Sequence, residues 1–401
     1  MARLLTFLLA AIASHAGVTL SVPARLRSTT AGSAGVRIIS QQWDPAKTAL
    51  ILCDFWDSHH CANAVKRVSE LAPCIAAVVG QAREMSLLIV HAPSDCMEAY
   101  AAHPARQRAI EGPFAPNLPK GIDAWMNWIS TEEEKCGYPI DAFDGGCDDN
   151  PKEAAAWKTE LKKQGRHTGH PWLGQHSAVK IDAERDIISD KGTEIWNVLH
   201  ARGINDVLLA GVHANMCVCG RPFGLMQLAK NGKNVVLLRD LTDTMYNPAM
   251  RPQVGHTAGT ELIVSHIERF IAPTVLSTEV FGGETPLFTH ERRRHLAIMI
   301  GEDEYRTEET LPAFMDSMVK DFRVTYILPT KEKPADFFNM TALATADLLL
   351  VSVRHRLLPR AQLAALRKFA ERGGANAGIR TASHAFAQRD GQQIPPVPGC
   401  G

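Results

Sequence analysis

Apolar runs of strand length alternate with longer helical stretches over much of the chain. The strand candidates are residues 48–53, 87–91, 207–212 and 234–238, and the helical candidates are residues 64–84, 194–201 and 222–231. This alternation is typical of a parallel sheet with crossover helices. The strand runs are apolar at consecutive positions, as expected where helices cover both faces. The pattern predicts an α/β domain over residues 45–275, a three-layer doubly wound parallel sheet.

The alternation stops between residues 94 and 172, in an insertion rich in Pro, Gly, Trp and Asp. So long a segment without regular structure is usually a lid or a binding loop. Its Asp-rich part, residues 143–149, lacks the spacing and final Glu of an EF-hand, which favours a solvated turn over a calcium site. Cys136 and Cys147 lie in this insertion and could pair, although the sequence does not fix the connectivity.

A second alternation begins near residue 294. Its strand candidates are residues 295–301, 324–328, 346–353 and 378–380, with a helical stretch at 360–372. We therefore expect a second, smaller α/β unit over residues 294–390, after a linker at 276–293 and before a tail at 391–401.

The chain starts with a short basic segment, an apolar run at residues 4–13 and the small-x-small sequence Ser14-His15-Ala16. These features predict a secretory signal cleaved after Ala16, and hence a secreted or periplasmic protein. The stretch 17–44, rich in Ser, Gly, Ala and Arg, is interpreted as a linker. In an oxidising compartment, nine cysteines would leave at least one unpaired.

The formal net charge is zero, with 43 basic and 43 acidic side chains. No electrostatic footprint points to nucleic acid or to a membrane surface after signal cleavage. We expect a small-molecule substrate, no cofactor, no metal ion and possibly a homo-oligomer.

Two reactive residues follow strands of the predicted sheet. Asp54 comes directly after residues 48–53, and Cys217 follows residues 207–212 through a short turn. In open parallel sheets the ligand crevice lies at this strand edge. Pro222 suits a first helical turn, so a helix should begin around 218–221, and its dipole would favour a Cys217 thiolate. From position alone, Cys217 could equally be structural or paired. A redox role for Cys217 and Cys219 comes third, because their spacing lacks the two-residue gap of thioredoxin-like sites.

A resemblance to the isochorismatase and nicotinamidase superfamily rests on three segments: ALILCD at 49–54, AVK at 178–180 and GVHANMCV at 211–218. The resemblance implies a triad in which Asp54 is the general base, Lys180 stabilises the thiolate and orients Asp54, and Cys217 attacks a carbonyl. It also implies a cis peptide after Val212 and an oxyanion hole formed by the backbone amides of His213 and Cys217.

The chain departs from this family at two places. Lys180 is followed by IDAERD instead of an aromatic-rich turn, which leaves His176 as a rival for its role. The Asp-x-His metal pair of nicotinamidases is absent from residues 91–95, which argues against that activity and its metal. Polar and aromatic residues near the crevice are candidate substrate contacts: Trp56, His59, His176, Arg221 and Tyr246.

The second unit resembles trehalose-utilisation-like proteins, which share the flavodoxin-like fold of class I glutamine amidotransferases. The resemblance rests on IGEDEY at 300–305, ADLLL at 346–350 and GIRTASHAF at 378–386. An amidotransferase would have its cysteine nucleophile after the last of these strands, where this chain has Arg380. We therefore expect a binding or assembly module.

Together these features predict an exported cysteine hydrolase that acts on an amide or a related C–N or C–O bond. The alternative is a noncatalytic small-molecule or carbohydrate-binding protein on the same scaffold. A Lys180 side chain that points away from Asp54 would favour the alternative.

Overall fold

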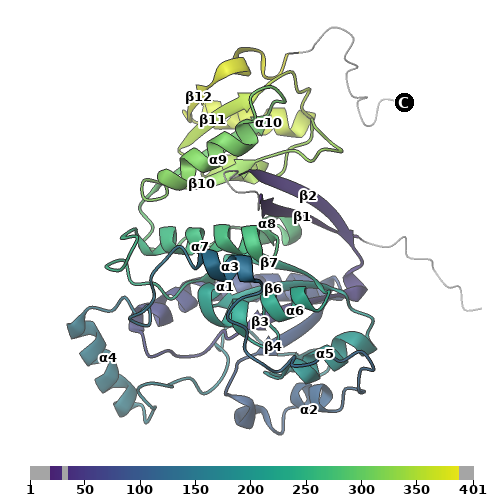
Figure 1. Ribbon diagram of the computed structural model, residues 1–401, viewed down its shortest axis with the longest axis vertical. Coiled ribbons are helices and arrows are strands. Elements are labelled where there is room, and N and C mark those ends of the chain that lie inside the picture. Colours follow the sequence, from purple (N-terminus) through teal and green to yellow (C-terminus); the bar gives the residue numbers. More distant parts are fainter. Residues whose placement is uncertain (1–18, 29–34, 388–401) are drawn as a thin grey trace, which may run out of the picture.

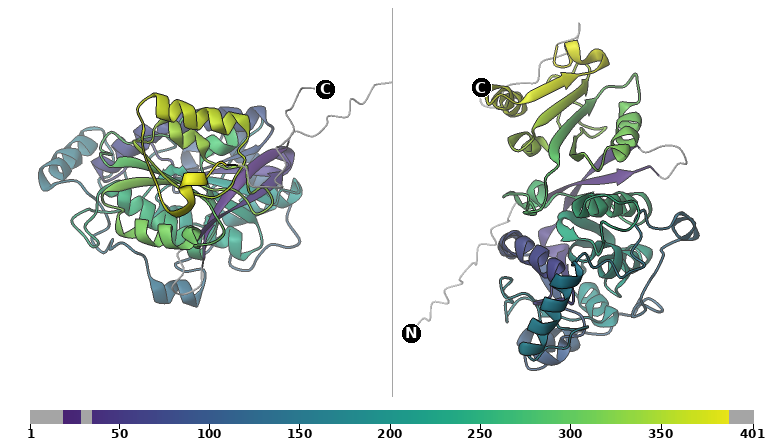
Figure 2. Two further views of the ribbon diagram at one scale, coloured as in Figure 1. Left: turned by 90° about the horizontal axis from the view of Figure 1, so that it is seen from above. Right: turned by 90° about the vertical axis from the view of Figure 1, so that its left-hand side faces the viewer.

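The computed structural model describes residues 19–28 and 35–387. The predicted signal segment and the 391–401 tail lie outside this range. Two α/β units are stacked end to end, with an antiparallel strand pair between them (Figures 1 and 2).

The larger unit is built on an eight-stranded sheet in the order β2-β1-β8-β7-β6-β3-β4-β5. Strands β3 to β8 run parallel, and β1 is antiparallel to both of its neighbours. The strands are β1 (Leu20–Arg27), β2 (Val36–Trp43), β3 (Thr48–Cys53), β4 (Leu88–Ala92), β5 (Ile187–Ile188), β6 (Asp206–Val212), β7 (Asn234–Asp243) and β8 (Thr274–Val275). The predicted fold class is confirmed.

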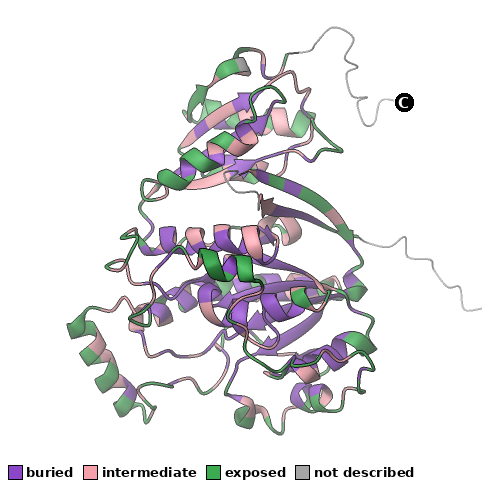
Figure 3. Ribbon diagram, in the orientation of Figure 1, coloured by how far each residue is buried: buried purple, intermediate pink, exposed green. Residues whose placement is uncertain are grey.

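Helices cover both faces of this sheet, which explains the consecutive apolar positions. In β3, Ala49 and Ile51 pack on the side of α5 (Gly192–Ala201), α6 (Leu225–Lys230) and α7 (His256–Phe270). Leu50 and Leu52 pack on the other side, against α1 (Ala62–Glu84) and α8 (Ser277–Phe281). Each fully buried aliphatic side chain contributes about 1.5–3 kcal/mol to folding. The continuous buried core of the larger unit is visible in Figure 3.

The stretch predicted as a linker at 17–44 instead carries the strand pair β1–β2, so that prediction is wrong. Leu20, Val22 and Ala24 of β1 are buried in the core of the larger unit. Val36 and Ile38 of β2 are buried against the smaller unit. A strand that is buried on one face needs apolar residues only on that face. The polar residues between them make the whole stretch look polar, which concealed the two strands. The predicted linker at 276–293 likewise contains α8, which packs on β1, β7 and α1.

The smaller unit is a four-stranded parallel sheet in the order β10-β9-β11-β12, as expected of a small α/β unit. The strands are β9 (Arg294–Gly301), β10 (Phe322–Ile327), β11 (Leu348–Val353) and β12 (Ala375–Gly378). Its helices are α9 (Thr307–Ser317), η4 (Met340–Ala344), α10 (Arg360–Glu371) and η5 (Arg380–His384). The last strand, β12, ends at Gly378, two residues before the end of the strand predicted at 378–380.

The insertion at 94–172 contains short helices joined by loops: η2 (Met97–Tyr100), α2 (Pro104–Ile110), α3 (Thr131–Cys136) and α4 (Pro151–Lys163). A further short turn, η1 (Pro45–Lys47), precedes β3. Within the described ranges, none of the helices combines the length and apolar character needed to cross a bilayer.

Candidate active site

Asp54 and the turn that carries Cys217 emerge side by side from the sheet. Strands β3 and β6 are parallel neighbours, and Cys53 is in register with Gly211. Gly211 has a φ of +121°, and a Cβ at this position would overlap the carbonyl oxygen of Cys53. Only glycine therefore permits this close approach. The expected meeting of the two strand ends at one sheet edge is confirmed.

Cys217 lies in a wide π-helical turn, Ala214–Val218, which follows β6. The amide of Val218 closes this turn by donating to the carbonyl of His213 at 3.2 Å. Helix α6 begins only at Leu225, so the expected helix start at 218–221 is wrong, and the dipole of α6 does not act on the thiol. The Val212–His213 peptide is cis, as the family resemblance implied.

The carboxylate of Asp54 is fully buried and accepts hydrogen bonds on both oxygens. Oδ1 accepts from the amide of Ser94 at 2.8 Å, and Oδ2 accepts from Nε of Arg221 at 2.9 Å. The Cys217 thiol lies beside this carboxylate, close enough for the two groups to raise or lower each other's pKa. Burial raises the pKa of Asp54, and the charge of Arg221 only partly offsets it. The carboxylate is thus a stronger base than an exposed aspartate.

The Cys217 thiol is protonated in the resting site. Burial raises its pKa well above the usual range and the negative charge of Asp54 adds to this, while Arg221 opposes it. Burial is the largest effect on Arg221 and lowers its pKa, but Asp54 and the neighbouring cysteines together outweigh it and the guanidinium pKa is raised. Transfer of the thiol proton to Asp54 would move one negative charge from oxygen to sulfur beside the same guanidinium. No additional buried charge would be created.

The structure does not bring Lys180 to Asp54. Its side chain is exposed, and Nζ donates to the carbonyl of Ser177 at 2.9 Å. The loop is held elsewhere, because Arg83 donates to the Lys180 carbonyl at 2.6 Å and also pairs with Asp186. The cation beside the carboxylate is Arg221, which we had considered only as a substrate contact. Its place in the turn directly after Cys217 is the sequence signal that could have found it.

His176 does not take the place of the lysine either. Its ring lies 5.6 Å from that of Phe55, and its Nδ1 accepts from the amide of Ala178 at 3.3 Å. Within the described part of the chain, no hydrogen bond joins His176 to Asp54 or Cys217.

Aromatic side chains of the insertion cover this sheet edge. Trp172 stacks on Trp56, with ring centroids 4.4 Å apart, and also on His59. The indole of Trp56 donates to the carbonyl of Ser94 at 3.0 Å. Trp125 lies over the guanidinium of Arg221 at 5.6 Å. The insertion therefore shields the ion pair from bulk water, which strengthens its electrostatics.

Tyr246 is a structural residue and not a substrate contact, contrary to expectation. Its side chain is fully buried. The hydroxyl donates to the carbonyl of Met250 at 2.9 Å and accepts from the amides of Gln253 at 3.1 Å and Val254 at 3.3 Å. These three bonds hold the loop before α7, and they use the hydrogen-bonding capacity of the hydroxyl.

A small cavity of about 10 Å³ lies beside Asp54, lined among others by Trp56, Ser58, His59 and His213. This volume corresponds to roughly one water molecule. The Nε2 atom of His213 and the hydroxyl of Ser58 are buried and have no protein partner among the described residues. Burial lowers the pKa of His213 to about 3, so its ring is neutral at physiological pH. Both groups are able to hydrogen-bond a water molecule at this position.

Neither a family model nor a curated protein matches this chain. Among solved structures, a cysteine hydrolase from Pseudomonas syringae pv. phaseolicola 1448A is 15% identical, with a TM-score of 0.36, covering 59% of this chain and 92% of the other. An isochorismatase family protein from Burkholderia thailandensis is also 15% identical, with a TM-score of 0.32, covering 59% and 94%. Similarity at this level does not assign an activity to the chain.

Proposed function

We propose that the larger unit is a cysteine hydrolase of the isochorismatase-like kind, with Cys217 as nucleophile and Asp54 as general base. Arg221 takes the role that the family resemblance gave to Lys180. The observation that carries this proposal is the position of the Cys217 thiol beside Asp54, whose carboxylate is ion-paired with Arg221 at 2.9 Å. Nucleophile, base and orienting cation are arranged as acyl-transfer chemistry requires.

In the proposed reaction, the sulfur of Cys217 forms a bond to the carbonyl carbon while its proton passes to Asp54. The oxyanion of the tetrahedral intermediate accepts hydrogen bonds from the backbone amides of His213 and Cys217. Asp54 then returns the proton to the leaving nitrogen, the C–N bond breaks and a thioester remains. A water molecule hydrolyses the thioester with Asp54 again as base, which restores the thiol. The cavity beside Asp54 is suited to hold that water.

The proposed substrate is a small amide or a related carbonyl compound. Trp125 lies over Arg221, and Trp172 stacks on Trp56 at the sheet edge; this aromatic cover favours a small substrate over a folded protein. Beneath these aromatic side chains, Arg221 stabilises the Asp54 carboxylate before proton transfer and the Cys217 thiolate after it. Arg221 therefore has no need to bind an anionic substrate.

A burst experiment with p-nitrophenyl acetate, an activated acyl donor, tests the proposal. We expect release of p-nitrophenolate stoichiometric with enzyme, and mass spectrometry of the quenched protein should place the acetyl group on Cys217. Cys217→Ala should abolish the burst, and Asp54→Asn should slow it about 10²–10⁴-fold, as expected on loss of a general base. Cys136→Ser is the matched control, because this exposed cysteine lies outside the site. Release of ammonia from a panel of small carboxamides would then identify the substrate.

A burst that survives in Cys217→Ala, or an acetyl group on another cysteine, would refute the nucleophile assignment.

The second candidate is a noncatalytic binding protein on the same scaffold. Two observations favour it: the exposed Lys180 side chain is bonded to the Ser177 carbonyl and, among the described residues, forms no ion pair with Asp54, and burial raises the pKa of the Cys217 thiol. No burst and no acetylation of the wild-type protein, together with retained folding, would support this candidate over the hydrolase.

A further inference from the structure

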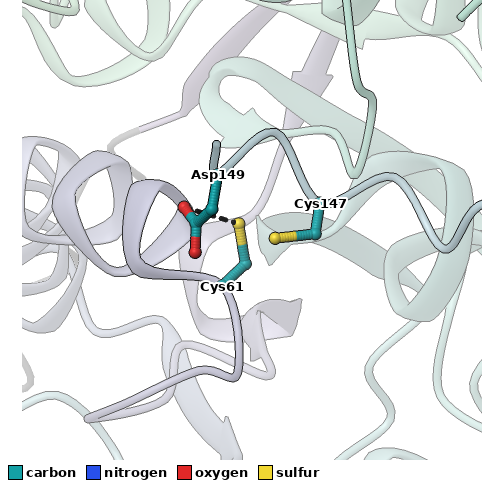
Figure 4. Close-up of side chains that lie close together, drawn as sticks. All are labelled: Cys61, Cys147 and Asp149. Carbon is teal, nitrogen blue, oxygen red and sulfur yellow. Dashed lines mark hydrogen bonds between the residues drawn. The ribbon is translucent and has the colours of Figure 1, made fainter. Parts of the chain in front are cut away.

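A second cluster of reactive side chains lies outside the Asp54–Cys217–Arg221 site. Cys61, at the start of α1, meets Cys147 and Asp149 from the insertion. The sulfur of Cys61 lies beside the Asp149 carboxylate, and the sulfur of Cys147 points towards that of Cys61 (Figure 4). One ligand atom from each of the three residues lies within 4.8 Å of the others. The Sγ of Cys61 is 3.4 Å from Oδ1 of Asp149. The Sγ atoms of Cys61 and Cys147 likewise lie within 4.8 Å of each other.

We propose that Cys61, Cys147 and Asp149 bind a thiophilic divalent cation, with Zn²⁺ as the best match. Zinc takes thiolate and carboxylate ligands in tetrahedral geometry, at about 2.3 Å to sulfur and about 2.0–2.2 Å to oxygen. These lengths give a sulfur–oxygen edge of about 3.5 Å and a sulfur–sulfur edge of about 3.8 Å. The observed 3.4 Å between Cys61 and Asp149 matches the first edge.

The segment that carries Cys147 is fixed independently of any metal. Gly146 has a φ of +73°, and a Cβ there would overlap the carbonyl oxygen of Met245, so the loop lies directly on that backbone. The Asp144 carboxylate accepts from the amide of Gly146 and from the side chain of Asn247, at 2.9 and 2.8 Å. The sulfur of Cys147 is thereby placed before a cation binds, which lowers the entropic cost of binding.

Asp149 is held by the first turn of α1. Its oxygens accept from the amides of Ala62 at 2.7 Å and Asn63 at 2.8 Å. The neighbouring Asp148 is ion-paired with Arg67 at 2.8 Å. Within the described ranges no lysine or arginine forms an ion pair with Asp149, so this carboxylate keeps its charge available for a cation. A carboxylate oxygen with two lone pairs accepts a backbone amide and still ligates a metal.

The charges of the site suit a thiolate-bound cation. Binding of M²⁺ releases one proton from each thiol, and two thiolates with one carboxylate leave a net charge of about −1 on the complex. The N-terminus of the long helix α1 lies beside this charge, since its first amides bind Asp149, and it stabilises the charge. Three protein ligands leave the fourth tetrahedral position to water, and Cys147 and Asp149 are partly exposed to solvent.

The cluster is connected to the nucleophile turn. Cys61 packs with Met245, and both Cys147 and Met216 pack against this small core. Met216 precedes Cys217 in the chain. The backbone of Met245 is also joined to the side chain of Asn215 by two hydrogen bonds of 2.9 and 3.0 Å. A bound cation would therefore join the insertion to α1 and brace the turn on which Cys217 lies. The site does not depend on the proposed hydrolase chemistry.

Titration of the reduced, metal-free full chain with Co²⁺ tests the site, because thiolate-bound tetrahedral Co²⁺ has intense visible and near-ultraviolet absorption. We expect saturation at one equivalent, release of two protons and displacement of Co²⁺ by Zn²⁺. Cys147→Ser and Cys61→Ser should abolish the thiolate absorption. Asp149→Asn should weaken Co²⁺ binding at least tenfold while keeping an oxygen that accepts the α1 amides. The control Cys136→Ser should titrate like the wild type.

The proposal is overturned if the spectrum persists in Cys147→Ser, or if the reduced chain takes up no Co²⁺. It is also overturned if the protein as isolated contains no metal and is lighter by two hydrogens, with Cys61 and Cys147 in one disulfide-linked peptide. Circular dichroism of Cys147→Ser and Asp149→Asn separates loss of the site from loss of folding, because neither residue is fully buried.

Discussion

Replacement of Arg221 by methionine tests whether this guanidinium is the counter-ion of Asp54. The Asp54 side chain has no exposed surface, and that of Arg221 is 20% exposed. Removal of one partner of a buried ion pair typically costs about 3–5 kcal/mol in the free energy of unfolding. Water reaches the partly exposed side of Arg221, so we expect a loss of about 3 kcal/mol at pH 7.

Protonation of Asp54 limits this loss. With an unfolded-state pKa of about 3.9, neutralising one aspartate costs about 4 kcal/mol at pH 7 and about 1.4 kcal/mol less for each unit of lower pH. Burial already raises the pKa of Asp54 in the folded protein, and loss of Arg221 would raise it further. A carboxyl group with a raised folded-state pKa loses stability as pH rises above its unfolded pKa. The gap between variant and wild type should therefore be small near pH 4 and widen towards pH 7.

Urea unfolding followed by tryptophan fluorescence measures this gap, because all seven tryptophans lie before residue 276 and report on the larger unit alone. Arg221→Lys, which keeps the charge, should lose less stability. Arg185→Met removes an exposed arginine and should change little. A loss for Arg221→Met that is the same at pH 4.5 and pH 7 would show that packing, and not charge compensation of Asp54, explains the role of Arg221.

Three further variants test other assignments. Lys180→Ala should leave the p-nitrophenolate burst unchanged, because its exposed side chain is bonded to Ser177; a large decrease would restore Lys180 to the site. Tyr246→Phe should lower the free energy of unfolding by about 1–3 kcal/mol in urea melts, because the amides of Gln253 and Val254 lose their acceptor. Burial raises the pKa of Asp243, but Arg67 and His256 outweigh it and the pKa is lowered, so the ion pairs of Asp243 stabilise the fold above its unfolded pKa. Asp243→Asn should therefore cost about 3 kcal/mol at pH 7 and less as pH falls towards 3, and a gap independent of pH would contradict this.

The sequence determined the elements whose signal is local. The run at 48–53 coincides with β3, and 207–212 coincides with β6 to within one residue. Consecutive apolar residues of strand length indicate a strand covered on both faces, and parallel strands end at one edge. The positions of Asp54 and Cys217 followed from these two facts. The strand pair β1–β2 was missed because polar residues interrupt both strands. β2 buries only Val36, Ile38 and Trp43, and the buried run of β1 at 22–25 includes a proline and an arginine.

Tertiary structure decided which side chains meet. The sequence indicated Lys180, with His176 as its rival, as the partner of Asp54 and gave Arg221 only as a substrate contact. In the fold, Arg83 binds the Lys180 carbonyl and pairs with Asp186, and Arg221 is the cation at the carboxylate. In the same way, Cys147 lies against Cys61 and not Cys136, because the loop at Gly146 is fitted to the backbone of Met245. These contacts join residues far apart in the chain, and their geometry depends on how whole segments pack. Local periodicity carries no information about such packing, so the identity of the counter-ion and the choice of which cysteines lie together were set by the fold alone.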